Sequence, residues 1–560
     1  MRPWLARYDA DVPHSLAPYP QRTLIDYLAD HARHYGDDAA LLFEGARVSW
    51  ADLDRLSNAF ATALSDLGVV AGDRVALILP NCPQFLIAEF GAWKLGAIIA
   101  PLNPVYTEEE LSTLLASSGA KVVVVLTRYY ERVKTYQPRT AVETVIATNI
   151  KEYLKPLTRL LFTAFKEKEE GDRVALRDGD LAFADLLRRE AVPRAQLYVR
   201  PEHDATILPS GGTTGVPKGV VGSHHNMVIA GLQLSAWLRS ALVEGRDVLM
   251  VPLPLFHVYG LIGVQSLSVV ARMPMLLVAN PRDIKGLLHA IAVEKPSFFC
   301  TVPALLNAML NHPSVLTGKV SFASLKVCFS GGAPLMSETI RRYQELTGGR
   351  LIEGYSLTEA QMATVANPVR GVNKVGSIGM PLPDVDVRIV DPDSGVGDVA
   401  QGDVGEIIIR APQRMRGYWN NDDETKLVLR TQPSGETWLF TGDLGYLDPD
   451  GYIFIVDRKK DLIKVSGYQV WPREIEEVLS THPGVLEAAV ASVPDAARGE
   501  VPKAWVVPRA GATPSPDELR SFCRERLAPY KVPAQVAIVS ELPKSGAGKV
   551  LRRILRDLPA

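Results

Sequence analysis

The chain has 560 residues, of which 47% are hydrophobic, and it carries a formal net charge of -2 at pH 7. This length favours more than one domain and allows a large core. The nearly balanced charge argues against a protein that holds nucleic acid through phosphate contacts, so we expect no nucleic-acid partner.

The cysteines and the apolar stretches indicate a compartment. Four cysteines are scattered with neither metal-binding nor redox spacing, at Cys82, Cys300, Cys328 and Cys523. This favours free thiols in a reducing compartment. The N-terminal residues include no apolar core of a secretory signal, and the longest apolar stretch, 258–271, is too short to span a bilayer. We therefore expect a soluble cytoplasmic protein.

Strand-like runs alternate with helical patterns from about residue 38 to 400. The first of these elements are a strand, two helices and a strand, at DRVALILP (73–80), PQFLIAEFGAWKLGA (83–97), YTEEELSTLLASSGA (106–120) and KVVVVL (121–126). Thr107 and Glu110 stand in capping-box spacing, so the second helix is predicted to begin there and to end near Gly119. Such alternation predicts parallel sheets with helical crossovers.

The pattern changes after residue 385. Three short strands are predicted at VDVRIVD (385–391), GEIIIRA (405–411) and GYIFIVDR (451–458), as in an antiparallel region. A helix, a strand and a second helix follow, at WPREIEEVLS (471–480), VLEAAVASV (485–493) and SPDELRSFCRERL (515–527). Pro472 stands where the first of these helices begins, and Ser515 with Glu518 repeats the capping-box spacing. This last unit of about 100 residues has the size of a small domain.

Five stretches combine glycine with polar residues, as ligand-binding loops do. In LPSGGTTGVPKGV (208–220), glycines and hydroxyls precede Lys218, so backbone N–H groups can approach a polyphosphate closely. It is not the Walker pattern, because Pro217 and Gly219 flank the lysine. The other stretches are SGGAPL (330–335), EGYSLTEA (353–360), TGDLGYLDPDGY (441–452) and PKSGAGKVLRR (543–553). Each alone is more readily a surface turn, so the set as a whole carries the argument.

In this order and spacing, the five stretches resemble the adenylate-forming superfamily, which includes acyl-CoA synthetases, firefly-luciferase-like enzymes and the adenylation domains of peptide synthetases. The resemblance covers nearly the whole chain. It is closest to bacterial long-chain fatty-acid–CoA ligases, on stretches such as NPVYTEEEL (103–111), PLFHVYG (254–260), RMRGYWNNDDET (414–425) and RKKDLIKVSGYQVWPREIE (458–476).

The resemblance implies an α/β fold and a two-step reaction. A large N-terminal domain (1–457) would hold αβ-layered sheets and a distorted β-barrel-like region. A hinge (458–461) would connect it to a small mobile α+β C-terminal domain (462–560). A carboxylate would attack the α-phosphorus of ATP to give acyl-AMP and pyrophosphate, and the thiol of coenzyme A would then displace AMP. The expected cofactors and substrates are ATP, Mg²⁺, coenzyme A and a medium- or long-chain fatty acid.

The resemblance also implies an ATP site. The β- and γ-phosphates would be held by Ser210, Gly211, Gly212, Thr213, Thr214, Gly215 and Lys218. The adenine walls would be formed by Gly331, Gly332, Ala333, Gly354 and Tyr355. Asp443 would accept hydrogen bonds from the ribose hydroxyls, and Arg458 would bind ribose or phosphate. Many relatives have a second hydroxyl residue in place of Gly211, so one phosphate donor is absent here.

Catalytic roles follow from the same resemblance. Glu359 and Thr214 would bind Mg²⁺, because a hard cation prefers oxygen ligands. Thr358 would contact the α-phosphate, and Lys549 would stabilise the negative charge that develops there and on the acyl carboxylate. His257 would be a gate beside that carboxylate. The acyl pocket would be lined by the apolar residues that follow it, Val258, Tyr259, Leu261, Ile262 and Val264.

In this superfamily the C-terminal domain turns about its hinge between the two steps. Lys460 resembles the pivot residue. Lys464 and Gly467 would then face the thioester site, and Gly467 would leave room for the pantetheine arm. Composition alone does not separate such a hinge from an exposed charged turn.

The stretch from Glu152 to Arg173 resembles an addition found in long-chain members. Its apolar residues follow helical spacing, with basic residues nearby, at Leu157, Leu160, Leu161 and Phe165. A packed amphipathic helix is the favoured interpretation. The alternative is a helix for fatty-acid entry or for peripheral contact with the inner face of a membrane through 152–168.

Other functions stay open from the sequence. An acyl-AMP ligase that loads a carrier protein, an aryl or short-chain acyl-CoA ligase and a luciferase-like oxygenase share the motifs, and a non-catalytic nucleotide-binding scaffold is a different class. The joint presence of Thr214, Glu359, Asp443, Arg458 and Lys549 argues against the scaffold. The acyl chain length and the oligomeric state, a homodimer included, are not determined by the sequence.

Overall fold

The computed structural model describes residues 2–188, 199–210, 217–332, 335, 337–362, 364–466, 468–495, 497–544 and 550–557. Its contacts divide the chain into two compact units. The large unit comprises Leu5–Asp386 and Arg410–Arg430, and the small unit comprises Val387–Ile409 and Thr431–Ala560 together with Met1–Trp4. These units group residues by contact and not by motion, so the domains 1–457 and 462–560 and the hinge at 458–461 stay predictions.

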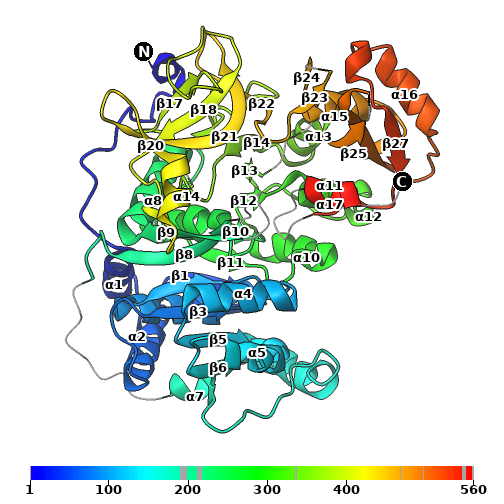
Figure 1. Ribbon diagram of the computed structural model, residues 1–560. Coiled ribbons are helices and arrows are strands. Elements are labelled where there is room, and N and C mark those ends of the chain that lie inside the picture. Colours follow the sequence, from blue (N-terminus) through cyan, green and yellow to red (C-terminus); the bar gives the residue numbers. More distant parts are fainter. Residues whose placement is uncertain are drawn as a thin grey trace. The chain divides into compact units, whose positions relative to one another are not determined.

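One sheet of the large unit has nine strands, in the order β16-β15-β14-β13-β12-β10-β11-β1-β2 (Figure 1). The pairs from β14 through β1 are parallel, as the sequence predicted, and the two ends of the sheet are antiparallel. The strands are β1 (Ala39–Phe43), β2 (Ala46–Ser49), β10 (Leu249–Val251), β11 (Met275–Leu277), β12 (Phe298–Thr301), β13 (Val327–Ser330), β14 (Arg350–Tyr355), β15 (Val365–Ala366) and β16 (Met380–Pro381).

The second sheet of the large unit has eight strands, in the order β19-β9-β8-β4-β3-β5-β6-β7. It is parallel except for the hairpin of β8 with β9 and the pairing of β9 with β19. The strands are β3 (Arg74–Ile78), β4 (Ile98–Pro101), β5 (Val122–Leu126), β6 (Thr144–Thr148), β7 (Leu181–Ala182), β8 (Asp204–Ser210), β9 (Lys218–Ser223) and β19 (Gly417–Tyr418). The strands predicted at 73–80 and 121–126 are confirmed as β3 and β5.

Helices accompany these strands, and several of them, such as α3 between β3 and β4, are the crossovers expected for parallel pairing. They are α1 (Leu24–His34), α2 (Trp50–Asp66), α3 (Pro83–Lys94), α4 (Glu108–Ser118), α5 (Tyr130–Tyr136), α6 (Pro156–Leu161), α7 (Phe183–Leu186), α8 (His224–Leu238), α9 (Ser266–Val270), α10 (Ile284–Glu294), α11 (Pro303–Leu310), α12 (Pro313–Leu316), α13 (Ser337–Thr347) and α14 (Asp422–Val428), with the π-helices η5 (Phe162–Lys166) and η6 (Tyr259–Gln265). The predicted capping box of α4 is present between Thr107 and Glu110, and Gly119 ends that helix in the left-handed conformation.

Two further sheets, each of five strands, lie mainly in the small unit. The first pairs β17 (Asp386–Val390), β18 (Gly405–Arg410), β20 (Leu429–Thr431), β21 (Thr437–Leu447) and β22 (Ile453–Arg458). The second contains β23 (Ile463–Val465), β24 (Tyr468–Val470), β25 (Val485–Asp495), β26 (Gly499–Pro508) and β27 (Gln535–Ile538), accompanied by α15 (Pro472–Ser480), α16 (Pro516–Arg524) and α17 (Arg552–Asp557). The predicted antiparallel region and the predicted starts of α15 at Pro472 and of α16 after Ser515 are confirmed.

The favoured interpretation of residues 152–173 was wrong. The segment does form α6 and η5, but neither contains a buried residue. Leu157, Leu160, Leu161 and Phe165 are 69%, 65%, 49% and 72% exposed. Helical spacing alone does not say whether an apolar face has a partner. Among the described helices, none has the length and apolar character needed to cross a membrane.

Candidate active site

The carboxyl ends of β13 and β14 bring two predicted motifs together. The strands pair in parallel, so Gly331 and the pair Gly354–Tyr355 emerge at one edge of the sheet. A Cβ atom on Gly331 would lie 3.3 Å from the Gly354 carbonyl oxygen and 3.3 Å from Tyr259 Cε1. One on Gly354 would collide with the Phe329 ring at 2.0 Å. Close packing therefore favours glycine at Gly354 strongly and leaves little room for a side chain at Gly331, beside Tyr355.

The end of the hairpin β8–β9 carries the predicted phosphate loop. Ser210, the last residue of β8, pairs in register with Lys218, the first residue of β9. The described residues nearest to the loop are Ser210 and Pro217. Gly211, Gly212, Thr213, Thr214 and Gly215 lie outside the described residues, so their roles stay predictions.

A chain of polar contacts connects Lys218 with Glu359. Lys218 Nζ lies 2.5 Å from Glu424 Oε2 and 5.2 Å from the centre of the Tyr418 ring. The Tyr418 hydroxyl donates to Glu359 Oε1 at 2.9 Å. Burial, reinforced by the charge of Glu359, raises the pKa of Tyr418, so that its hydroxyl stays protonated and remains a donor. The predicted phosphate-binding lysine and the predicted metal ligand are therefore parts of one polar cluster.

The turn after Glu359 is held in an uncommon backbone conformation. Gln361 and Met362 have φ values of 54° and 65°. For residues other than glycine, positive φ is uncommon and is concentrated at functional sites. The Gln361 backbone N–H and Nε2 donate to the Thr358 carbonyl oxygen at 3.1 and 3.0 Å. The predicted catalytic residues Thr358 and Glu359 therefore lie on a turn that its own contacts hold in place.

A small apolar cavity, with a volume of about 10 Å³, adjoins this turn. It is lined by Met362, by residues of α8 and of the segment from η6 into α9, and by two phenylalanines: Leu234, Leu238, Tyr259, Gly263, Val264, Leu267, Phe298 and Phe329. Of the pocket residues predicted from the sequence, Tyr259 and Val264 line this cavity. Val258, Leu261 and Ile262 are buried but do not line it, because successive residues of a helix point in different directions.

His257 immediately precedes the helical segment that forms one wall of the cavity. Its Nδ1 accepts a hydrogen bond from the Tyr259 backbone N–H at 3.3 Å, and its own backbone N–H donates to the Pro254 carbonyl oxygen at 3.1 Å. The histidine is thus fixed at the start of η6. Its role as a gate stays a prediction.

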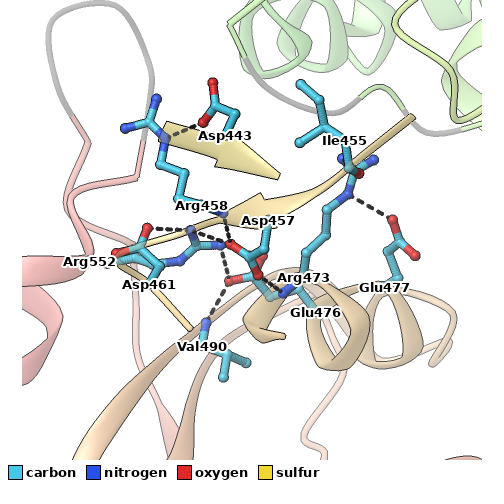
Figure 2. A network of polar contacts seen from close by, with 10 residues as sticks. All are labelled: Asp443, Ile455, Asp457, Arg458, Asp461, Arg473, Glu476, Glu477, Val490 and Arg552. Atoms are coloured by element: carbon cyan, nitrogen blue, oxygen red, sulfur yellow. Dashed lines mark hydrogen bonds and ion pairs between the residues drawn. The ribbon is translucent and has the colours of Figure 1, made fainter. Parts of the chain in front are cut away.

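The small unit holds the other predicted ATP contacts. Arg458 on β22 faces Asp443 on β21, and Arg458 Nε donates to Asp443 Oδ1 at 3.1 Å (Figure 2). Lys464 is exposed on β23, and its backbone N–H donates to Glu500 Oε2 at 3.2 Å. Burial lowers the pKa of Lys460, and the positive charge of the nearby Arg458 lowers it further.

Three further predicted residues, Ala333, Gly467 and Lys549, lie outside the described residues. The sequence-based prediction missed Tyr418 and Glu424. Both occur in RMRGYWNNDDET, where only the resemblance drew attention to the stretch. Their contacts with the site depend on the pairing of β19 with β9, which no local sequence pattern predicts.

Two family models match the chain, the AMP-binding enzyme model over residues 28–419 and the AMP-binding enzyme C-terminal domain model over residues 474–549. The chain belongs to the AMP-binding enzyme family. A long-chain-fatty-acid–CoA ligase of Bacillus subtilis is 38% identical over 559 residues, which cover 99% of this chain and 98% of the relative. A protein of the same name from Yersinia pestis is 38% identical over 561 residues, which cover 99% and 97%.

Solved structures agree with this membership. ATP-bound MatB of Rhodopseudomonas palustris matches with a TM-score of 0.82 at 28% identity, over 96% of this chain and 99% of the other. A fatty acyl CoA synthetase of Mycobacterium tuberculosis matches with a TM-score of 0.71 at 29% identity, over 96% and 98%. The resemblance to adenylate-forming enzymes and the expected α/β fold of this AMP-binding enzyme are thereby confirmed.

Proposed function

We propose that this AMP-binding enzyme joins a medium- or long-chain fatty acid to coenzyme A through acyl-AMP, with release of AMP and pyrophosphate. One observation carries the proposal: the turn from Thr358 to Met362 belongs to both the polar cluster and the apolar cavity. At the polar end of this turn lies the Glu359 carboxylate, which accepts a hydrogen bond from Tyr418. At the other end, Met362 forms part of the apolar wall. The names of the bacterial relatives agree with this assignment.

The donor chemistry of the polar cluster fits Mg-ATP. Glu359 offers carboxylate oxygens to a hard cation, and Lys218 offers a positive charge to phosphate. Within the described part of the chain, no group of three or more His, Cys, Asp and Glu side chains could hold a metal ion by itself. We therefore propose that phosphate oxygens complete the Mg²⁺ shell, together with Thr214. The ion would neutralise charge on the phosphates.

The protein's own residues would align the two substrates and stabilise the negative charge that develops in the reaction. A carboxylate nucleophile needs no general base, so catalysis depends on alignment and on charge stabilisation. The acyl tail would enter at this cavity as its lining side chains move apart, and Thr358 would contact the α-phosphate beside it. We propose that Asp443 and Arg458 bind the ribose, that Gly331, Gly332, Ala333, Gly354 and Tyr355 enclose the adenine, and that Lys464 and Gly467 serve the thioester step.

The test measures pyrophosphate release with a panel of carboxylic acids from acetate to palmitate, with and without coenzyme A. We expect kcat/KM to rise with chain length, since each buried methylene contributes about 0.8 kcal/mol, and coenzyme A to be consumed. Best turnover of acetate or of an aromatic acid would contradict the substrate class. Acyl-AMP formation with no use of coenzyme A would favour a carrier-loading ligase instead.

We further propose that this enzyme works in the cytoplasm and touches the inner face of a membrane through α6 and η5. The four exposed apolar side chains of this segment are accompanied by exposed basic ones, Lys155, Arg159, Lys166 and Lys168. An apolar stripe with basic neighbours suits an anionic lipid surface. A membrane is also where a long-chain fatty acid partitions.

Co-sedimentation with phosphatidylglycerol vesicles and with phosphatidylcholine vesicles tests this contact. We expect binding to the anionic vesicles that a Leu160→Ser, Phe165→Ser double variant loses, without a change in melting temperature, because both side chains are already exposed. A matched variant, Leu316→Ser, alters an equally exposed leucine elsewhere. If the wild type binds neither vesicle, the contact does not exist. If sizing then shows a dimer that the double variant loses, this face joins two copies of the chain.

A further inference from the structure

The predicted hinge is flanked by a buried charge cluster whose residues have no part in the proposed binding of ATP, fatty acid or coenzyme A. Figure 2 shows Asp457 at the end of β22, with the guanidinium of Arg552 (α17) beside it and the backbone nitrogen of Arg473 (α15) facing its carboxylate, while the Arg473 guanidinium is directed toward Ile455 and Glu477. Asp457 precedes the segment 458–461 in the chain, and both arginines follow it. The cluster therefore joins the two sides of the predicted hinge within the small unit.

Arg473 attaches the first turn of α15 to β22 at two points. Its backbone N–H donates to Asp457 Oδ2 at 3.0 Å, and its Nη1 donates to the Ile455 carbonyl oxygen at 2.7 Å. Asp457 is only 4% exposed, so its carboxylate depends on the backbone N–H groups of Arg473 and of Arg458, the latter at 2.8 Å. Any turn of α15 relative to β22 must break both Arg473 contacts.

Arg552 connects the same cluster with α17. It is the first residue of α17 and follows Lys549 by three positions. Its Nη2 donates to both oxygens of Glu476 at 2.9 Å, and its Nη1 lies 3.1 Å from Asp461 Oδ2 and 3.7 Å from Asp457 Oδ1. One guanidinium thus joins α15, the end of the hinge and the end of β22.

The charges make this arrangement sensitive to the loss of Arg552. Three carboxylates surround Arg552, and burial raises the pKa of Asp457 and of Glu476 despite its presence. Although burial opposes the charge of Arg552, the carboxylates of Glu476 and Asp457 raise its pKa. A buried carboxylate that loses its cation is strongly destabilised. The cluster should therefore open when the Arg552 guanidinium is removed, whereas loss of the Arg473 guanidinium removes the contact of α15 with the Ile455 carbonyl oxygen.

We propose that Asp457, Arg473 and Arg552 form a latch across the hinge. The contacts of Arg473 and Arg552 with β22 and Asp457 break when the C-terminal segment turns. The contacts of Arg552 with Glu476 join two residues that both follow the hinge, so they would persist while the C-terminal segment turns. The latch rests on the proposed two-step function and on the hinge at 458–461.

Limited proteolysis with trypsin tests the latch without any substrate. Trypsin cleaves after lysine and arginine, and Arg458, Lys459 and Lys460 supply sites inside the hinge itself. We expect cleavage there to be at least fivefold faster in Asp457→Asn, Arg473→Gln and Arg552→Gln than in the wild type. Arg526→Gln is the matched control, because Arg526 pairs within its own region with Glu525 at 2.9 Å. Equal hinge cleavage in all five proteins overturns the latch.

The two half-reactions supply the second readout. Acyl-AMP formation is measured as pyrophosphate release in a single turnover, and thioester formation is measured from supplied acyl-AMP and coenzyme A. The three variants Asp457→Asn, Arg473→Gln and Arg552→Gln should all change the ratio of the two rates in the same direction. The expected change is about tenfold, as is typical of coupling between two states. Arg526→Gln should leave the ratio unchanged. Equal losses in both halves would mean that the cluster is only structural, and this overturns the latch.

Two further controls separate the possible failures. Arg552→Lys keeps the charge but loses the fork that spans Glu476 and Asp461; we expect a partial effect, and this variant replaces Arg552→Gln if the latter does not fold. A wild type that releases no pyrophosphate with any acid would refute the proposed function. The proteolysis result would still decide the latch.

Discussion

The Tyr418 hydroxyl donates a hydrogen bond of 2.9 Å to Glu359 Oε1, although 58 residues lie between them in the chain. Tyr418 also places its ring beside Lys218 Nζ, at 5.2 Å from the ring centre. Strand β19 makes this possible, because its pairing with β9 brings Tyr418 next to the end of the predicted phosphate loop. One tyrosine thus links the proposed metal ligand to the proposed phosphate-binding lysine.

Replacing Tyr418 with phenylalanine tests this link. A hydrogen bond to a charged group contributes about 1.5–3 kcal/mol, so we expect kcat/KM for Mg-ATP to fall by roughly ten- to a hundredfold, while the fold is kept. Tyr35→Phe alters a half-exposed tyrosine outside the site and should have no effect. Unchanged Mg-ATP kinetics in a folded Tyr418→Phe variant would show that Glu359 needs no support from this hydroxyl.

The sequence predicted elements well where the signal is local. Thr107 with Glu110 and Gly119 mark the ends of α4 by side-chain capping and by a left-handed glycine, and both features are properties of a few adjacent residues. The sequence could not place Tyr418 or Glu424 in the site, because their position depends on strand pairing across the chain.

The apolar face of residues 157–165 shows the same limit. Its spacing correctly predicts a helix, but spacing carries no information about whether a neighbouring element covers the face. The residues after His257 are a related case. From Val258 to Leu267 all are buried, and all but Gln265 and Ser266 are apolar or glycine. Of these, only Tyr259, Gly263, Val264 and Leu267 line the cavity, because the direction of a side chain around a helix is not readable from composition.

Gly263 provides a test of the proposed acyl pocket. A Cβ atom on this residue would lie 3.4 Å from Met362 Cε and 3.4 Å from Tyr259 Cδ2. Gly263→Val should therefore fill part of the cavity without a backbone clash. We expect kcat/KM for dodecanoate to fall by about tenfold or more, the equivalent of two or more methylenes at about 0.8 kcal/mol each. Butanoate serves as the internal control and should be used almost as well as by the wild type. An equal loss for both acids would exclude this cavity as the acyl site.

Glu89 gives a pH-dependent prediction. It is fully buried on α3, and Gln265 Nε2 at the end of η6 donates to its Oε2 at 2.6 Å. Burial raises the pKa of Glu89 well above the usual value of 4.5. Below pH 4.5 both the folded and the unfolded chain hold this proton. As pH rises, the unfolded chain releases it first, so Glu89 lowers the free energy of unfolding progressively until its folded pKa is passed.

The variant Glu89→Gln keeps the shape and the acceptor and removes the titration. Its melting temperature, measured against the wild type, should therefore rise between pH 5 and pH 8. Glu169→Gln, at an exposed position, should show no such trend. A difference between Glu89→Gln and wild type that stays constant over this range would mean that Glu89 does not hold its proton in the folded state.

The two half-reactions also separate the roles proposed for Lys549 and Gly467. Lys544 and Val550 form a bridge that closes the base of the loop containing Lys549. Lys549→Ala removes a charge that would face the α-phosphate, and the loss of one such electrostatic partner typically costs on the order of 10²–10³ in rate. We expect this loss in acyl-AMP formation, with thioester formation from supplied acyl-AMP largely kept. Gly467→Leu should do the reverse, because a bulky side chain would obstruct the pantetheine arm. Lys544→Ala is the matched control, since Lys544 Nζ is already paired with Glu487 at 2.7 Å, and it should spare both steps. If Lys549→Ala and Gly467→Leu lose the same step to a similar degree, the C-terminal segment does not present two faces in turn.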